Sequence, residues 1–338
     1  MNDSARCLLP LMLTALLVPA IAASAEGNGT PSSPLELWHD RAVFSPRFFP
    51  EADSLSAEDI FVAGLEARFP NRVFREEPGG APGPAEPPLV ESLLPGVTYV
   101  RVHHLETALA RIRDALAANS LVLDLRNVEA ERDSALALGA ILAINETVKI
   151  SVTEQAAANE SAATDRTFPI EAEGLRRPLQ PVFVLTNQAT AGPLEALLAE
   201  LKDKGQIISI GTATAGRTGL FRRIDTTPPL HVLNGEWRPA SGESLLEDGF
   251  IPSVLMRVPP EEDRKAYRAL AEGKSLRTLV AADPAEDDRE ETDDLHNLLT
   301  RDPPEAPAEQ TIDAILQRAY FIATALQSMG KIATPERD

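Results

Sequence analysis

The sequence predicts an α/β domain built around a mostly parallel sheet. From about residue 96 onward, apolar strands and amphipathic helices alternate along the chain, which is typical of layered α/β folds. The clearest unit runs from Pro181 to Gly219, where a buried strand is followed by a turn, a helix that begins at Pro193 and a second strand. Hydrophobic residues make up 43% of the 338-residue chain, enough for a globular core.

Residues 1–25 have the features of a secretory signal peptide. Leu8 to Ala22 is mostly apolar, and Ala23-Ser24-Ala25 has the small-x-small pattern of a cleavage site. Cys7 is the only cysteine, so the mature protein would have no disulfide, thiol nucleophile or cysteine metal site. We therefore expect an exported protein, periplasmic or extracellular; an uncleaved membrane anchor is the alternative.

The charge balance excludes several classes of partner. The chain has a formal net charge of −19 and a pI near 4.7, whereas phosphate binding needs a basic face. We therefore expect no nucleic-acid binding, and no docking on anionic lipid once the signal peptide is removed.

The sequence shows no metal or cofactor motif. His103 and His104 follow the end of a predicted strand, but no acidic partner is placed beside them by the sequence. The remaining histidines show no ligand spacing. Gly211 to Thr218 superficially resembles a phosphate-binding loop, yet it lacks the lysine and a following helix. We expect neither a metal ion nor a cofactor.

Residues 26–95 are predicted to be an extended lead-in. Residues 56–69 can form one helix, because Ser56 can cap it and its apolar side chains lie on one side. Residues 78–88 are rich in Pro and Gly and read as a linker.

The remaining elements follow from hydrophobic periodicity. Strands are expected at residues 97–102, 121–125, 148–152, 182–185, 207–210, 230–233 and 254–258. Helices are expected at residues 107–119, 134–144, 193–205, 261–270 and 310–329. Residues 156–165 are expected to form an exposed loop.

An acidic insertion is expected at residues 283–309. Its first part, residues 283–294, is dense in carboxylates and contains Arg289 as its only base. This composition favours a solvated segment. Calcium binding would require a spaced acid-x-acid-x-acid-Gly loop, which is absent from this stretch.

Five segments in order resemble the tail-specific, or C-terminal processing, serine peptidases. They match the family's entry strand, its LILDLRN strand, the strand before its nucleophile, its GExTFGK loop and its G…GIxPD ending, at residues 97–102, 121–127, 182–187, 211–217 and 242–252. The resemblance covers residues 96–330 and implies a Clp-protease/crotonase-like spiral of strand-strand-helix units. Residues 26–95 are too few, beside their linker, for a complete copy of the family's peptide-binding PDZ domain.

The catalytic residues of that family do not recur here. Its nucleophilic serine falls on Gly192, which has no side-chain oxygen to attack a carbonyl. Its general-base lysine falls on Arg217, and arginine cannot lose its proton in a protein. Its glutamine falls on Phe221, and its Asn-Pro-Gly-Gly oxyanion turn falls on residues 128–131, with Ala130 at the amide-donating position.

These replacements lead us to expect a catalytically inactive relative that binds peptides or an envelope protein through the former active-site cleft. Arg217, Arg222 and Arg223 form a local basic spot that can hold a peptide carboxylate, or can instead pair with the protein's own carboxylates. One alternative is an active serine-type peptidase with an atypical nucleophile, for which Thr190 is a candidate. The other is a structural envelope protein with an unused cleft.

Overall fold

The computed structural model describes residues 63–64, 73–75, 87–154, 164–176, 180–224, 229–246, 248–280 and 311–332. The expected signal peptide at 1–25, most of the expected helix at 56–69 and the acidic insertion at 283–309 lie outside the described residues. Within the described residues, no helix is both long enough and apolar enough to span a bilayer. Contacts divide the chain into two compact units, and each is described by itself.

The larger unit comprises Pro84–Lys149, Pro169–Gly216 and Asp248–Asp338 and is built on a six-stranded sheet. The strands are β2 (Leu89–Leu94), β3 (Val97–Arg101), β4 (Ser120–Asp124), β7 (Val182–Thr186), β8 (Ile208–Gly211) and β11 (Val254–Leu255). Their order across the sheet is β11-β8-β7-β4-β3-β2. All neighbours are parallel except β2, which pairs antiparallel with β3. The side chains of β4 and β7 are all buried, as expected for strands covered on both faces.

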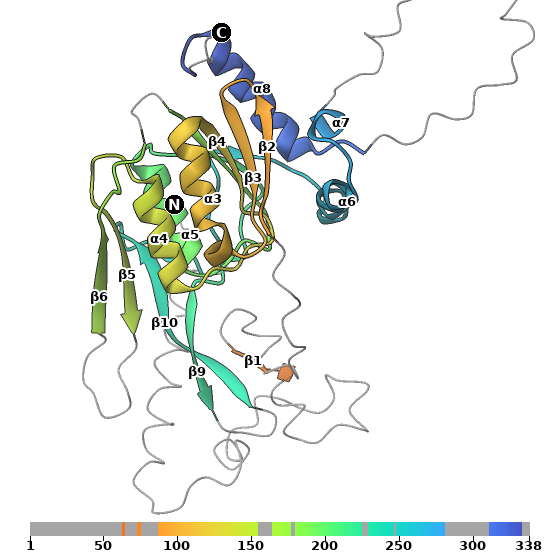
Figure 1. Ribbon diagram of the computed structural model, residues 1–338. Coiled ribbons are helices and arrows are strands. Elements are labelled where there is room, and N and C mark those ends of the chain that lie inside the picture. The colour runs from red at the N-terminus through yellow and green to blue at the C-terminus, as the bar shows by residue number, and fades with distance from the viewer. Residues whose placement is uncertain are drawn as a thin grey trace, which may run out of the picture. The chain divides into compact units, whose positions relative to one another are not determined.

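Three helices connect or follow the parallel strands. They are α3 (Leu105–Ala118), α4 (Arg132–Leu142) and α5 (Pro193–Asp203), and they lie side by side over one face of the sheet (Figure 1). Every residue of α5 from Pro193 to Leu201 is buried. The helix that follows β7 is therefore a core element of this unit.

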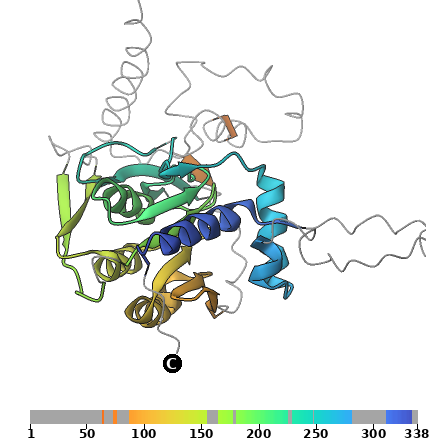
Figure 2. The same ribbon diagram turned by 90° about the horizontal axis from the view of Figure 1, so that it is seen from above.

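The opposite face of the sheet carries the three C-terminal helices. They are α6 (Pro260–Ala271), α7 (Leu276–Val280) and α8 (Ala314–Ser328); α7 lies beside α8, and α6 lies beside α7 (Figure 2). A continuous apolar core joins Tyr99, Val122 and Phe183 of the strands to side chains of these helices. Since side chains alternate along a strand, the neighbouring residues Leu121 and Leu123 face the α3–α5 side.

The smaller unit comprises Met1–Gly83, Ile150–Phe168 and Arg217–Glu247. Its strands are β1 (Val73–Arg75), β5 (Val148–Glu154), β6 (Thr164–Ile170), β9 (Gly219–Ile224) and β10 (Leu230–Pro239). The long strand β10 pairs antiparallel with β9 and also with β1 and β5, and β6 lies beside β5.

The architecture confirms the predicted α/β class, and most predicted elements are observed within a few residues of their expected ends. Four strands were not expected. β1 and β2 occupy parts of the expected lead-in, β6 begins inside the expected loop at 156–165, and β9 follows Arg217 where only a loop end was expected. The expected range 96–330 also contributes to both units, because residues 150–168 and 217–247 pair with one another in the separate antiparallel sheet.

Candidate functional site

The turn after β7 places Gly192 at the start of α5, with Pro193 as the first helical residue. Gly192 has φ 83° and ψ −157°, a combination that only glycine adopts without substantial strain. Proline suits the next position, because its fixed φ matches the helix and its missing N–H would have no partner within the helix. The local sequence therefore specifies a sharp entry into α5 that depends on glycine.

A side chain at position 192 would also collide with the segment that faces it. A Cβ built on Gly192 would lie 2.8 Å from the backbone oxygen of Ala130. The contact involves main chain on both sides, so no side-chain rotation can relieve it. Any residue other than glycine would require movement of one of the two backbones.

The facing segment, residues 128–130, is part of the oxyanion turn expected at residues 128–131. It pairs with the β7–α5 turn through a parallel bridge between Glu129 and Ala191. The Ala191 N–H donates to the Val128 carbonyl at 3.0 Å, and the Ala130 N–H donates to the Ala191 carbonyl at 3.4 Å. The Ala130 amide is thus used inside the protein, and the atom that this segment presents to position 192 is a carbonyl oxygen.

The hydroxyl of Thr190, the alternative nucleophile, is bound to the backbone. It donates to the Leu125 carbonyl at 2.9 Å and accepts from the Asn187 N–H at 3.2 Å. The residue is fully buried. Ser209, on β8, accepts from the Ser253 N–H at 2.8 Å. None of these hydrogen bonds joins the Thr190 or Ser209 hydroxyl to a side chain that could act as the general base.

Glu195, in the first turn of α5, holds the loop after β8. Its carboxylate is fully buried and accepts hydrogen bonds from the Thr214 hydroxyl and, at 2.8 Å, from the Gly216 N–H. The Thr214 hydroxyl in turn accepts from the Phe250 N–H at 2.7 Å. A carboxylate at a helix N-terminus is favoured by the helix dipole. These bonds fix the loop up to the residue that precedes Arg217.

Residues 96–256 match the profile of peptidase family S41. This part of the chain belongs to that family. The match confirms the resemblance to C-terminal processing peptidases, and no PDZ fold is evident among the described residues. A comparison with curated proteins found no match.

Several solved structures are similar to this chain. The photosystem II D1 C-terminal processing protease is 20% identical with a TM-score of 0.38, over 47% of this chain and 42% of that one. An S41 protease from Bacteroides fragilis is 18% identical with a TM-score of 0.44, over 72% and 58%. A peptidase from Parabacteroides merdae is 14% identical with a TM-score of 0.45, over 56% and 65%. The chain therefore spans less than two thirds of each of these relatives.

The other residues singled out in the S41 frame lie in the smaller unit. Arg217 is exposed and precedes β9, which contains Phe221, Arg222 and Arg223. Arg222 pairs in register with Val232, and Arg223 pairs with His231. Because consecutive residues of a strand point to opposite faces, the expected basic spot is divided between the two faces of β9. Arg217 remains the candidate that the family frame itself indicates.

A buried ionic cluster, which the sequence did not predict, lies at the C-terminal ends of β3 and β4. The Arg126 guanidinium is 1% exposed and contacts three carboxylates: Asp124 at 2.6 Å, Asp313 at 2.8 Å and Asp263 at 3.0 Å. The other oxygen of Asp263 accepts from the Asn187 side-chain amide at 2.7 Å. Arg126 is therefore linked through Asp263 to the turn that carries Gly192.

The charges of this cluster stabilise one another strongly. Burial by itself raises the pKa of the Asp124 carboxyl, but the Arg126 guanidinium and hydrogen bonds from Arg126 and Tyr99 outweigh it, so this pKa lies below its ordinary value of 3.8. Burial lowers the pKa of Arg126, yet Asp124 and Asp313 raise it well above its ordinary value. Burial, together with the Asp124 charge, raises the pKa of the Tyr99 phenol. Arg126 and Asp124 thus form a buried charged pair.

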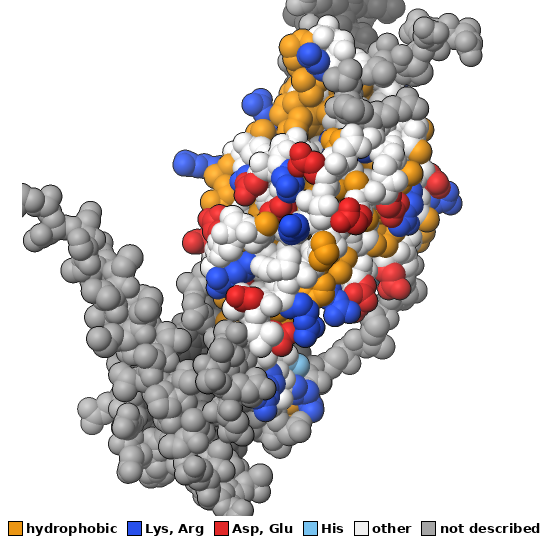
Figure 3. Space-filling model, turned by 90° about the vertical axis from the view of Figure 1, so that its left-hand side faces the viewer, with side chains coloured by type: hydrophobic (Ala, Val, Ile, Leu, Met, Phe, Trp, Pro, Cys, Tyr) orange, Lys and Arg blue, Asp and Glu red, His pale blue; other side chains and the backbone are white. Residues whose placement is uncertain are grey.

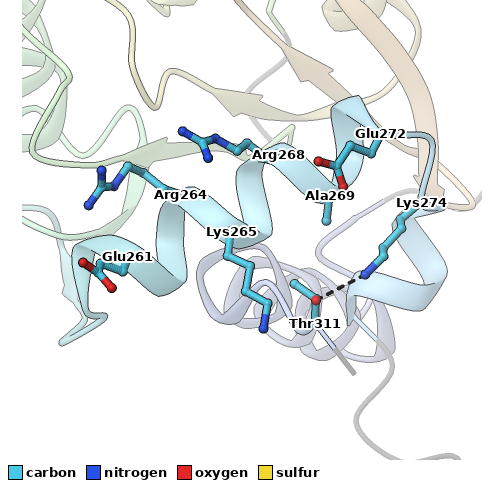
Figure 4. Close-up of a pocket in the computed structure, with 8 residues that line it drawn as sticks. All are labelled: Glu261, Arg264, Lys265, Arg268, Ala269, Glu272, Lys274 and Thr311. Atoms are coloured by element: carbon cyan, nitrogen blue, oxygen red, sulfur yellow. Dashed lines mark hydrogen bonds between the residues drawn. The ribbon is translucent and has the colours of Figure 1, made fainter. Parts of the chain in front are cut away.

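The two adjacent histidines that the sequence singled out, His103 and His104, lie just before α3. The His103 ring lies edge-on to Tyr267 at a centroid distance of 6.4 Å, and His104 is exposed before α3. Among the described ranges, no group of His, Cys, Asp and Glu side chains is arranged to hold a metal ion. A hollow of about 450 Å³ lies on the outer side of α6 (Figure 4). Its lining comes from α6, the chain after it and Thr311, and does not include Gly192 or Ala130.

Proposed function

We propose that this chain is an S41-type domain that has lost peptide hydrolysis and binds an extended peptide or a partner protein in the exported compartment. The observation that carries the proposal is the geometry at Gly192. The family's nucleophile position has no hydroxyl, adopts a glycine-only backbone conformation and would place any Cβ 2.8 Å from a carbonyl oxygen.

The surrounding groups support loss of catalysis. Acyl transfer needs donors aimed at the oxygen that becomes negative in the transition state. The Ala130 N–H is bonded to Ala191, and the Ala130 carbonyl is an acceptor that would repel a developing oxyanion. At the base position, Arg217 is a permanent cation that cannot accept a proton from a hydroxyl.

An arginine at position 217 is well suited to binding a peptide carboxylate. An exposed guanidinium can hold a carboxylate through two parallel hydrogen bonds. The loop that leads to Arg217 is fixed at Gly216 by the buried Glu195 carboxylate, so little ordering is required at that point when a ligand binds. Export rests on the apolar run and small-residue cleavage pattern of residues 1–25.

One experiment tests both parts of the proposal. A labelled peptide with a free C-terminal carboxylate is incubated with the protein, binding is followed by fluorescence anisotropy, and cleavage is followed by mass spectrometry. We expect binding without cleavage and no labelling by a fluorophosphonate probe. Arg217→Ala should weaken binding about fivefold, as expected for loss of a partly exposed charge-assisted pair. Arg166→Ala, an exposed arginine on β6 of the same unit, is the matched control.

Two results would contradict the proposal. Probe labelling or peptide cleavage that is abolished by replacing a single Ser or Thr would show an active hydrolase with another nucleophile. Equal affinity of the Arg217→Ala variant and the unmodified chain would remove Arg217 from peptide binding.

A further inference from the structure

We propose that the outer face of α6 binds an extended, carboxylate-rich segment of a partner protein. This site is separate from the turn that carries Gly192, and the inference goes beyond the proposed function. Five residues of α6 and its C-cap Glu272 recur at the spacing of one helix face, and with Lys274 and Thr311 they line the hollow of about 450 Å³. Figure 4 shows their side chains around the hollow.

The lining is unusually basic for this chain. It contains Arg264, Lys265, Arg268 and Lys274, against the two carboxylates Glu261 and Glu272. The whole chain carries a net charge of −19, so a face with excess positive charge attracts anions that the rest of the molecule repels. A nucleic acid would be a poor ligand, because its continuous charge would meet that repulsion along its length.

The spacing of the cations matches an extended peptide. Arg264 and Arg268 are one helical turn apart, about 6 Å along the axis, and Figure 4 shows both extending to the same side of α6. Alternate side chains of an extended chain share one face at a spacing of about 6.6 Å. Carboxylates at alternate positions can therefore meet the two guanidinium groups in turn, each as a bidentate pair. Lys274 lies beyond the end of α6 and donates to the Thr311 hydroxyl at 3.2 Å, which extends the basic face further.

The helix is held rigidly from its inner side. Asp263 is buried and bonds both to Arg126 at 3.0 Å and to the Asn187 amide at 2.7 Å. Arg101, also buried, donates to the Tyr267 carbonyl at 2.9 Å and places its guanidinium 3.5 Å from the centre of the Tyr267 ring. A face on a fixed helix needs little reorganisation to bind a ligand.

The test uses the full chain and two short fluorescent peptides of identical composition. One carries three glutamates at alternate positions among serines, and the other carries the glutamates three residues apart. We expect the alternating peptide to bind more tightly, and binding to weaken as salt is added. Arg264→Gln with Arg268→Gln should raise its Kd about tenfold, because two exposed ion pairs each contribute a few-fold.

A second double variant controls for overall charge. Arg257→Gln with Arg277→Gln removes the same charge from two exposed arginines outside the hollow and should change Kd less than about twofold. Equal weakening by the two double variants would overturn the proposal, since it would show attraction by net charge alone. No binding of the alternating peptide would also overturn it. Binding that appears only after the carboxylates of residues 283–294 are replaced by amides would assign the face to the chain's own segment instead.

Discussion

At Gly192, two independent features act against a side chain. The first is the backbone conformation, with φ 83° and ψ −157°, in a region occupied essentially by glycine alone. The second is the Ala130 carbonyl, 2.8 Å from the position that a Cβ would take. Because both are main-chain features, the constraint at Gly192 concerns the shape of the turn as well as the absence of a side chain.

Replacing Gly192 with alanine should separate these two effects. Gly205 also has a positive φ, 65°, and lies just beyond the other end of α5, but a Cβ there would meet nothing within 4 Å. Gly205→Ala should therefore cost only the conformational strain, about 1 to 2 kcal/mol of unfolding free energy. Gly192→Ala should cost at least about 1 kcal/mol more, because the contact with Ala130 adds to a backbone strain that is at least as large. Urea denaturation measures both values, and equal costs would show that the facing segment yields without resistance.

Among the elements, the Arg126 cluster connects three parts of the larger unit. Asp124 ends β4, Asp263 lies in α6, and Asp313 is the N-cap of α8, where it also accepts from the Leu316 N–H at 3.0 Å. The Arg126 guanidinium thus joins the central sheet to α6 and α8, on the face of the sheet opposite α3, α4 and α5. Apolar packing between the sheet and the helices has no directional bonds and allows the helices to shift along the sheet. A fixed set of charged hydrogen bonds instead specifies one arrangement.

Arg126→Met should strongly destabilise the fold, by about 3 to 5 kcal/mol at neutral pH, because three buried carboxylates lose their cation. Arg113→Met is the control, since the Arg113–Glu173 pair at 2.7 Å is partly exposed and should contribute less than about 1 kcal/mol. Thermal or urea unfolding of both variants provides the comparison. A similar small cost for both would mean that the buried cluster has no special role.

The stability of the unmodified chain and the stability of Arg126→Met should change with pH in opposite directions. In the unmodified chain the pKa of Asp124 is lowered below 3.8, so its contribution is present above that pH and is lost as pH falls through the folded value. In Arg126→Met, only the hydrogen bond from Tyr99 still opposes burial, so we expect the pKa of the Asp124 carboxyl to rise. The folded variant then binds more protons than the unfolded chain, so its stability falls as pH rises. The cost of the substitution should be smaller at pH 5 than at pH 8, and a cost that does not depend on pH would contradict this account.

For the whole molecule, the sequence predicted the buried parallel strands and the amphipathic helices well. These elements have strong local patterns, such as the continuous apolar run of β7. β2 and β9 were missed for physical reasons. β2 is an edge strand with exposed Glu91 and Ser92 and follows a Pro-rich stretch, and β9 contains two adjacent arginines. The propensity of such segments for a strand depends on the neighbouring strand that pairs with them.

The candidate site was predictable only in part. The positions of Gly192 and Ala130 follow from sequence motifs, and the structure brings their backbones together. The partners of Arg126 did not follow, because Asp263 and Asp313 are 137 and 187 residues away in sequence. A single sequence contains no signal that joins charged residues at such separations. The Ala130 N–H is bonded to Ala191, and the Ala130 carbonyl faces Gly192, only because the segment at residues 128–130 pairs with the turn after β7. The sequence alone does not reveal this pairing.

The last consequence concerns the net charge. At −19, long-range repulsion disfavours the compact state, while the buried Arg126 cluster is protected from screening. On the face shown in Figure 3, acidic and basic side chains are intermixed, so short-range attraction at the surface partly opposes the repulsion. We expect repulsion to dominate, because isolated surface pairs contribute little.

Sodium chloride should therefore raise the melting temperature at pH 8, with most of the gain reached by about 0.3 M, where the Debye length has fallen to about 6 Å. The gain should vanish near pH 4.7, where the net charge is close to zero. Chloride is preferable to sulfate, because sulfate also strengthens apolar burial. Differential scanning calorimetry at the two pH values gives the comparison. A melting temperature that falls with salt at pH 8 would show that surface ion pairs outweigh the net repulsion, and would place more of the stability at the exposed charges than in the buried cluster.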